Sequence, residues 1–143
     1  MSVSGIFNVQ IYNVLPTNSP SLNTANLQTL VSDLLTPGNP LTNGQGGTLQ
    51  FPSSGTYQFN GTITIGPDSE GPPVTQPYSL LFMGTGAQSQ PSPVLQMTEN
   101  DVDLFLVDNN TGDDNNIGGI LFQDLNIQYT VSPVEVKLPG LRG

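Results

Sequence analysis

The acidic residues are concentrated in one short stretch, and this stretch is the densest group of side chains that could bind a metal ion. Six of the eleven acids fall within sixteen positions: Glu99, Asp101, Asp103, Asp108, Asp113 and Asp114. Asp108, Asn110 and Asp114 offer side-chain oxygens at alternate positions around Gly112, and calcium prefers oxygen ligands. The bidentate Glu that closes an EF-hand loop is missing. Two interpretations stay open: a calcium site at these three residues, or a solvated turn that keeps the chain soluble without a cofactor.

The same stretch contains a pair of carboxylates that would approach the spacing for glycoside hydrolysis if it formed a strand. Two such groups must lie about 5 to 10 Å apart across a groove. If residues 101–107 are extended, Asp101 and Asp103 lie on one face of a strand and approach that separation. Any acid-rich stretch produces such pairs, so we assign no catalytic residue.

Aromatic side chains are the remaining candidates for contact with a ligand. Four tyrosines could stack on sugar rings: Tyr12, Tyr57, Tyr78 and Tyr129. Four phenylalanines at strand positions are expected in the core: Phe51, Phe59, Phe82 and Phe122. For the tyrosines, glycan contact and core packing both stay open.

The composition excludes several classes of function. The chain has neither cysteine nor histidine, which removes disulfides, thiolate nucleophiles and the usual zinc ligands. The two basic residues, Lys137 and Arg142, lie in the last seven positions, and the net charge is −9. Nucleic acid and membrane surfaces are therefore disfavoured partners, because binding either requires Lys and Arg. We see no classical signal peptide and no stretch approaching the roughly 20 apolar residues of a membrane span.

One helix is expected, near the start of the chain. Apolar residues recur at spacings of three and four over residues 24–35, with Asn23 as the cap and Pro37 and Gly38 after the end. Residues 6–15 alternate in part and predict a preceding strand.

The rest of the chain consists of short apolar runs separated by Gly, Pro, Asn and Ser. These runs predict strands at residues 48–51, 56–59, 62–65, 79–83, 94–97, 104–107, 119–122 and 125–129. An up-and-down barrel or sandwich would explain eight strands equally well on periodicity. A solenoid is favoured by the sharp corner at Asn60 and Gly61 and by the single upstream helix, which would close one end.

The order of several motifs resembles the pectate-lyase-like superfamily. GGTLQFPSSGTYQF at residues 46–59 is similar to the GGTVYFPPGTYLI segment that opens the right-handed parallel β-helix of that family. The upstream FNV at residues 7–9 and NTANLQTLV at residues 23–31 are similar to its first strand and capping helix. LLFMGTG at residues 80–86 and GILFQDLNI at residues 119–127 resemble later coils. The resemblance covers about residues 5–130.

The resemblance implies a mainly β fold: a short right-handed parallel β-helix of about three coils with one N-terminal capping α-helix. It implies a single domain, with the first strand and helix in residues 1–37, coils in residues 38–130 and a C-terminal tail in residues 131–143. Residues 17–22 lack the acids that precede the helix in the family. Catalytic and sugar-binding residues of the family generally lie in further coils.

Two functions from different classes follow as expectations. The first is a non-enzymatic structural or attachment module of a virion or extracellular assembly, like part of a phage tailspike or a capsid-decorating protein, contacting neighbouring assembly proteins and glycans. The second is the first segment of a polysaccharide lyase or glycoside hydrolase; a lyase is less favoured because its base is typically Arg or Lys. A short solenoid with an open end favours association. Because proteins of this family on virions are usually trimers with parallel axes, the resemblance implies a homotrimer, with residues 131–143 exchanging between subunits.

Overall fold

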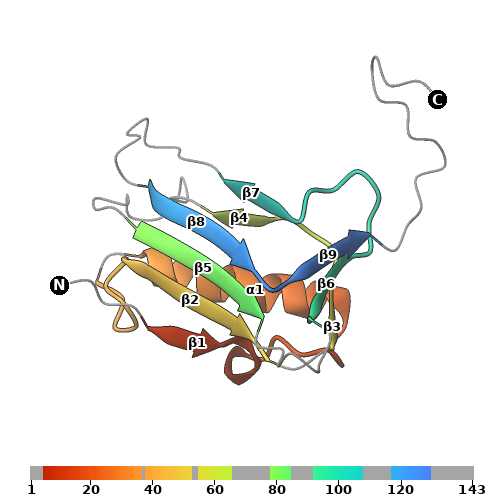
Figure 1. The fold of residues 1–143 in the computed structure, drawn as a ribbon, viewed down its shortest axis with the longest axis horizontal. Helices are drawn as coiled ribbons and strands as arrows, with labels where there is room; N and C mark the ends of the chain where they lie inside the picture. Colours follow the sequence, from red (N-terminus) through yellow and green to blue (C-terminus); the bar gives the residue numbers. More distant parts are fainter. Residues whose placement is uncertain are drawn as a thin grey trace, which may run out of the picture.

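The protein is mainly β, with parallel sheets and one α-helix, as expected at this level from the sequence (Figure 1). The computed structural model describes residues 5–36, 38–52, 55–65, 78–84, 92–107 and 117–129. Its elements in chain order are β1 (Ile6–Asn8), the 3₁₀-helix η1 (Val9–Tyr12), α1 (Pro20–Leu35), β2 (Gly46–Phe51), β3 (Thr56–Phe59), β4 (Ile63–Ile65), β5 (Tyr78–Gly84), β6 (Val94–Met97), β7 (Phe105–Val107), β8 (Ile117–Gln123) and β9 (Asn126–Tyr129). The eight strands predicted after the helix are thus confirmed, with small shifts at their ends.

The chain visits three sheets repeatedly and in the same order. The sheets have the strand orders β1-β2-β5-β8, β3-β6-β9 and β4-β7. A first pass therefore contributes β2, β3 and β4, a second contributes β5, β6 and β7, and a third contributes β8 and β9. Every strand pair that the structure describes is parallel, which excludes the meander of an up-and-down barrel for these strands.

Because successive passes pair in register, inward-facing side chains lie above one another in columns, and so do outward-facing ones. One inward-facing column is Leu49, Phe82 and Phe122. The rings of Phe82 and Phe122 are stacked, with centroids 4.9 Å apart and planes 15° from parallel. Tyr57 pairs with Leu95 in the same way, one sheet further on. These columns form the core between the sheets.

Helix α1 covers the first pass. It packs against β2, β3 and β4, and its buried stripe includes Leu27, Leu30 and Leu34. The stripe follows the spacing seen in the sequence, so the amphipathic pattern was a correct guide to the buried face.

Side chains of α1 also bond to the strand edges of the first pass that no described strand covers. Gln28 accepts a hydrogen bond from the Thr64 backbone N–H at 2.7 Å and donates one to the Thr64 carbonyl at 3.0 Å. The Asn60 backbone N–H donates to Thr24 Oγ1 at 3.0 Å. An uncovered edge would leave such backbone groups without partners, so the helix closes this end through polar groups as well as apolar ones.

The helix begins earlier than predicted, and Asn23 is not its cap. Ser19 is the N-cap, its hydroxyl accepting from the Leu22 N–H at 3.3 Å, and Pro20 is the first helical residue. Proline suits this position because its φ is already helical and it has no N–H to satisfy. The predicted end is confirmed, with Thr36 as the C-cap.

The strand predicted over residues 6–15 is wrong beyond Asn8. The Asn8 side chain accepts from the Gln10 backbone N–H at 2.9 Å, and η1 follows. Asn13 then takes a left-handed conformation at φ 63°. Asparagine favours such local turns over a strand, which the apolar alternation alone did not reveal.

Asn23 is instead a buried connector between three segments of the chain. Its side chain accepts from the Leu15 N–H at 3.0 Å and from Asn18 Nδ2 at 3.0 Å. It donates to the Leu15 carbonyl at 2.9 Å and to the Gln58 carbonyl at 3.2 Å. Four bonds satisfy the whole hydrogen-bonding capacity of the amide, which has no exposed surface.

Replacing this amide is expected to weaken the fold strongly. Asn23→Ala should lower the free energy of unfolding by about 3 kcal/mol, because it leaves backbone groups of Leu15 and Gln58 without partners. Asn26→Ala, on the same helix, should cost under about 1 kcal/mol, since Asn26 makes one exposed bond, to the Asn13 carbonyl. Urea unfolding followed by circular dichroism measures both variants. Equal losses would contradict the connecting role of Asn23.

Candidate functional site

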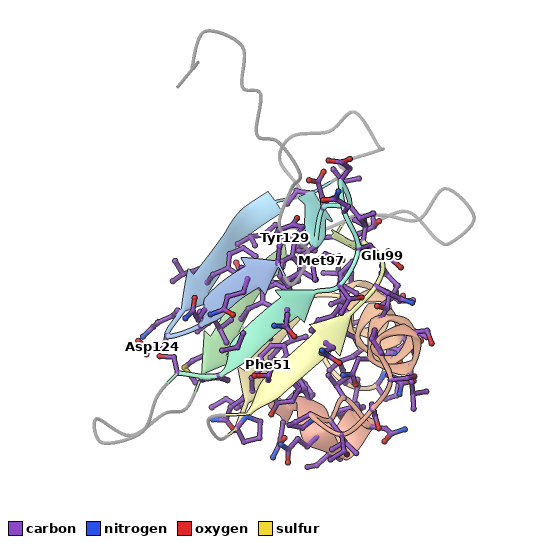
Figure 2. The ribbon with its side chains drawn as sticks, turned by 90° about the vertical axis from the view of Figure 1, so that its right-hand side faces the viewer. Phe51, Met97, Glu99, Asp124 and Tyr129 are labelled. Carbon is purple, nitrogen blue, oxygen red and sulfur yellow. The ribbon has the colours of Figure 1, made fainter. Side chains whose placement is uncertain are left out.

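Within the part of the chain that the structure describes, the acidic residues do not form the sites that the sequence offered. Glu99, Asp101 and Asp103 are exposed, and Figure 2 shows Glu99 well away from Asp124. Asp101 has a φ of 58°, and β7 begins only at residue 105, so the expected strand face carrying Asp101 and Asp103 is wrong. Among the described residues, no group of three or more acids is placed to hold a metal ion. The proposed calcium ligands Asp108, Asn110 and Asp114, with Asp113, lie outside the described residues.

Two of the four candidate tyrosines are core residues, which corrects their place among possible glycan contacts. Tyr57 has no exposed surface; its hydroxyl donates to the Pro52 carbonyl at 2.7 Å and accepts from Gln10 Nε2 at 2.9 Å. Tyr78 is 2% exposed. Because both rings are enclosed in the core, neither has a face on which a sugar could stack.

The hydroxyl of Tyr78 differs from that of Tyr57. It is buried and has no hydrogen-bond partner in the structure as described. Burial raises the pKa of Tyr78, because the tyrosinate anion would lose its hydration there. The ring of Tyr78 therefore stabilises the core by packing, whereas the buried hydroxyl makes no hydrogen bond that would offset the loss of its hydration.

The other two tyrosines keep accessible surface. Tyr12 is partly buried and meets Phe7 edge to face, with ring centroids 6.3 Å apart. Tyr129 is 47% exposed at the end of β9, and its hydroxyl donates to the Val102 carbonyl at 2.8 Å. Figure 2 shows Tyr129 above Met97, the residue with which it pairs in register. These two residues remain the tyrosine candidates for glycan contact.

A row of amide side chains runs across the outward face of the β3-β6-β9 sheet. Gln58, Gln96 and Gln128 pair in register, and we call them the glutamine ladder. Gln58 Nε2 donates to Gln96 Oε1 at 2.9 Å. The first two are half-buried and Gln128 is exposed. Amides both donate and accept, so the ladder offers a neutral, fixed set of groups to a hydroxyl-rich or peptide ligand.

The sequence does contain a signal for this ladder, although the apolar pattern alone did not predict it. The three strands are TYQF, VLQM and NIQY, each with glutamine between two apolar residues at the third position. The repeat intervals are 38 and 32 residues, from 58 to 96 and from 96 to 128. An unequal interval hides such a repeat unless the strands are first aligned by their pairing.

A second surface runs across the outward face of the β1-β2-β5-β8 sheet. Ile6, Thr48, Leu81 and Leu121 pair in register, and we call them the outer column. Ile6 is 65% exposed and Leu121 is 57% exposed, so the column presents apolar surface to the outside. Exposed apolar groups that line up in this way are typical of a contact with another protein surface.

The third surface is the last pass. We call Val107, Phe122, Ile127 and Tyr129 the open end. These four side chains are 40–48% exposed. Phe122, Ile127 and Tyr129 pair in register with residues of the second pass that are fully buried: Phe82, Leu95 and Met97. The other three phenylalanines predicted in the core are fully buried, whereas the side chain of Phe122 stays partly exposed, because no described element packs on the outer side of the third pass.

No protein-family model, curated protein or solved structure matches this chain. The surfaces above must therefore be interpreted from their own chemistry. Among the described residues, no helix is long and apolar enough to cross a membrane, and this includes α1.

The two buried tyrosines make a matched pair for a stability test. Tyr57→Phe should lower the free energy of unfolding by about 1 to 2 kcal/mol, because the Pro52 carbonyl and the Gln10 amide lose their partner. Tyr78→Phe should leave it unchanged within about 0.5 kcal/mol or raise it, because no bond is lost. Thermal and urea unfolding compare the two variants at pH 7. A loss in Tyr78→Phe as large as in Tyr57→Phe would contradict the unpartnered hydroxyl.

At alkaline pH the stability difference between the same two variants should widen in the same direction. An unfolded tyrosine titrates at about 10, whereas the folded pKa of Tyr78 is higher. Above pH 10 the unfolded state therefore loses its proton first, and the wild-type protein loses stability as pH rises. Tyr78→Phe should lack part of this loss, and Tyr57→Phe should retain it.

Proposed function

We propose that this chain is a short right-handed parallel β-helix, related in architecture to the pectate-lyase-like superfamily, that acts as a non-enzymatic structural or attachment module. Its place would be a virion or another extracellular assembly, in the manner of a tailspike segment or a capsid-decorating protein. The observation that carries this proposal is the repeated visit of the chain to three sheets in one order, with in-register columns. Parallel strands that stack in this way give a rigid body with long, regular faces.

The chemistry of the faces favours attachment over catalysis. The glutamine ladder and the half-buried Thr48 and Thr64 on neighbouring sheets place neutral polar groups on strands, where they are held in fixed positions. Such groups bind glycans and peptides by hydrogen bonds and do not act as a general acid or base. The described acids form no group of three that could hold a metal ion, and the strand face on which a hydrolase pair was expected does not form.

Two experiments test this function directly. Mass spectrometry of purified particles and of culture supernatant should find the chain in particles or on an extracellular assembly. Incubation with acidic polysaccharides should produce no new reducing ends or unsaturated products. Substantial product would overturn the attachment role in favour of a polysaccharide-degrading enzyme, and a chain found only among intracellular proteins would also contradict it.

The proposal includes self-association through the outer column, as a homotrimer with parallel axes. Ile6, Leu81 and Leu121 form an apolar strip on the outward face of the β1-β2-β5-β8 sheet, interrupted by Thr48 on β2. Burying such a strip against another subunit removes apolar surface from water, which is the main source of free energy in association. A trimer would bring these strips to its axis and leave the glutamine ladders available to other partners.

A leucine substitution in the strip should weaken the trimer. Leu121→Gln is expected to lower the association constant by about tenfold or more, because an interfacial apolar contact is lost. Leu106→Gln is the matched control, since Leu106 is also an exposed outward-facing leucine, at 46%, but lies on β7 in another sheet. Sedimentation equilibrium at micromolar concentration measures both. A monomeric wild-type protein, or equal effects of the two variants, would overturn association through the outer column.

A further inference from the structure

The third pass of the chain lacks its third strand in the structure as described. The first two passes each contribute one strand to all three sheets, whereas the third contributes β8 and β9 only. As a result β7 has a described partner on one side, β4, and none on the other. By the order of the passes, the next strand after β9 would belong beside β7.

The side chains at this end show what a further layer would cover. Ile65 on β4 is fully buried, whereas its register partner Val107 on β7 is 48% exposed. Phe122 and Ile127, from the other two sheets, are exposed to a similar extent, at 40% and 44%. The exposed apolar surface thus gathers at one end of the stack, and apolar groups of a further segment would complete the columns.

We propose that residues 134–138, VEVKL, pair with β7 of the same chain as a parallel third strand of the β4-β7 sheet. The segment alternates, with Val134, Val136 and Leu138 on one side and Glu135 and Lys137 on the other. Such an alternation suits a strand with one face toward a core. Pro133 and Pro139 flank the segment, at positions where a strand tolerates a missing N–H.

The length of the connection favours the chain's own β7 over that of another copy. Four residues, 130–133, separate β9 from the proposed strand. The corresponding connection is three residues in the first pass, 60–62 between β3 and β4, and seven in the second, 98–104 between β6 and β7. The proposed connection lies between these values, so it can follow the same course within one chain.

Charge does not oppose this pairing, because residues 134–138 carry Glu135 and Lys137 and are neutral. Residues 1–130 contain ten acids and no base, a charge of −10, whereas residues 131–143 contain Glu135, Lys137 and Arg142, a charge of +1. The two parts sum to the net charge of −9. The exposed Asp101 and Asp103 precede β7 directly, so the end that receives the strand lies in a negative field.

Nuclear magnetic resonance on the full chain tests the pairing. Backbone amide protons of residues 134–138 should show cross-strand nuclear Overhauser contacts to residues 105–107, and their exchange should be slowed by about 100-fold or more. A sample mixing isotope-labelled and unlabelled chains identifies contacts between copies. Unprotected amides without such contacts, or contacts found only between different chains, would overturn the proposal.

A matched pair of variants adds a test of the inward face. Val136→Asn should abolish the protection of residues 134–138, because an amide would enter the apolar columns. Lys137→Asn, on the outward side, should preserve it. Resonances of β2 and β5 report whether the rest of the fold is intact. Equal behaviour of the two variants would overturn the stated orientation. The pairing is measured within one chain, so its failure leaves the attachment role and the trimer standing.

Discussion

The stacked sheets depend on side chains of α1 that take the place of a missing strand. In a parallel stack the first strand of each sheet has one edge without a neighbour, and its N–H and C=O groups need partners. β1 covers the edge of β2. Gln28 bonds to both backbone groups of Thr64 on β4, and Asn23 bonds to the Gln58 carbonyl on β3. The helix is therefore joined to the stack by polar contacts at the edges of β3 and β4 and by its leucine stripe, whereas the third sheet is extended by β1.

The sequence predicted the elements well, because the signals for them are local. The strands TYQF and VLQM are short apolar runs bounded by turn residues, and both lie where the pattern placed them. The helix start and the short first strand were missed where local signals compete. Ser19 and Pro20 compete with Asn23 as a helix start, and the turn between Asn8 and Gln10 competes with the apolar alternation. The partners that hold Asn23 inside the fold are up to 35 positions away in the chain, and no local pattern contains that information.

The candidate site was harder to predict, since exposure depends on the layer in which a residue lies. Tyr57 and Ile127 occupy the same column, through Leu95, but only Tyr57 is fully buried. Phe59 and Tyr129 form another such column, through Met97. Residue type and spacing are alike in each layer, whereas burial follows from what lies above and below. The glutamine ladder escaped detection for the same reason: its members are adjacent only after the strands have been paired.

The two ends of the stack differ in chemistry, and this difference constrains how copies can associate. At the α1 end, Gln28 and Asn23 already bond to backbone groups of Thr64 on β4 and of Gln58 on β3, which hinders the addition of a strand from another chain to these two edges. Head-to-tail growth would need free edges on all three sheets at both ends, and α1 occupies two of them. Two copies joined open end to open end would be related by a two-fold axis, which limits that contact to a dimer. A larger closed assembly must then form through the sides of the stack, where the outer column presents its apolar strip and the glutamine ladder presents its amides. Closure of the open end by the chain's own residues 134–138 would remove the end-to-end contact and leave association to the sides.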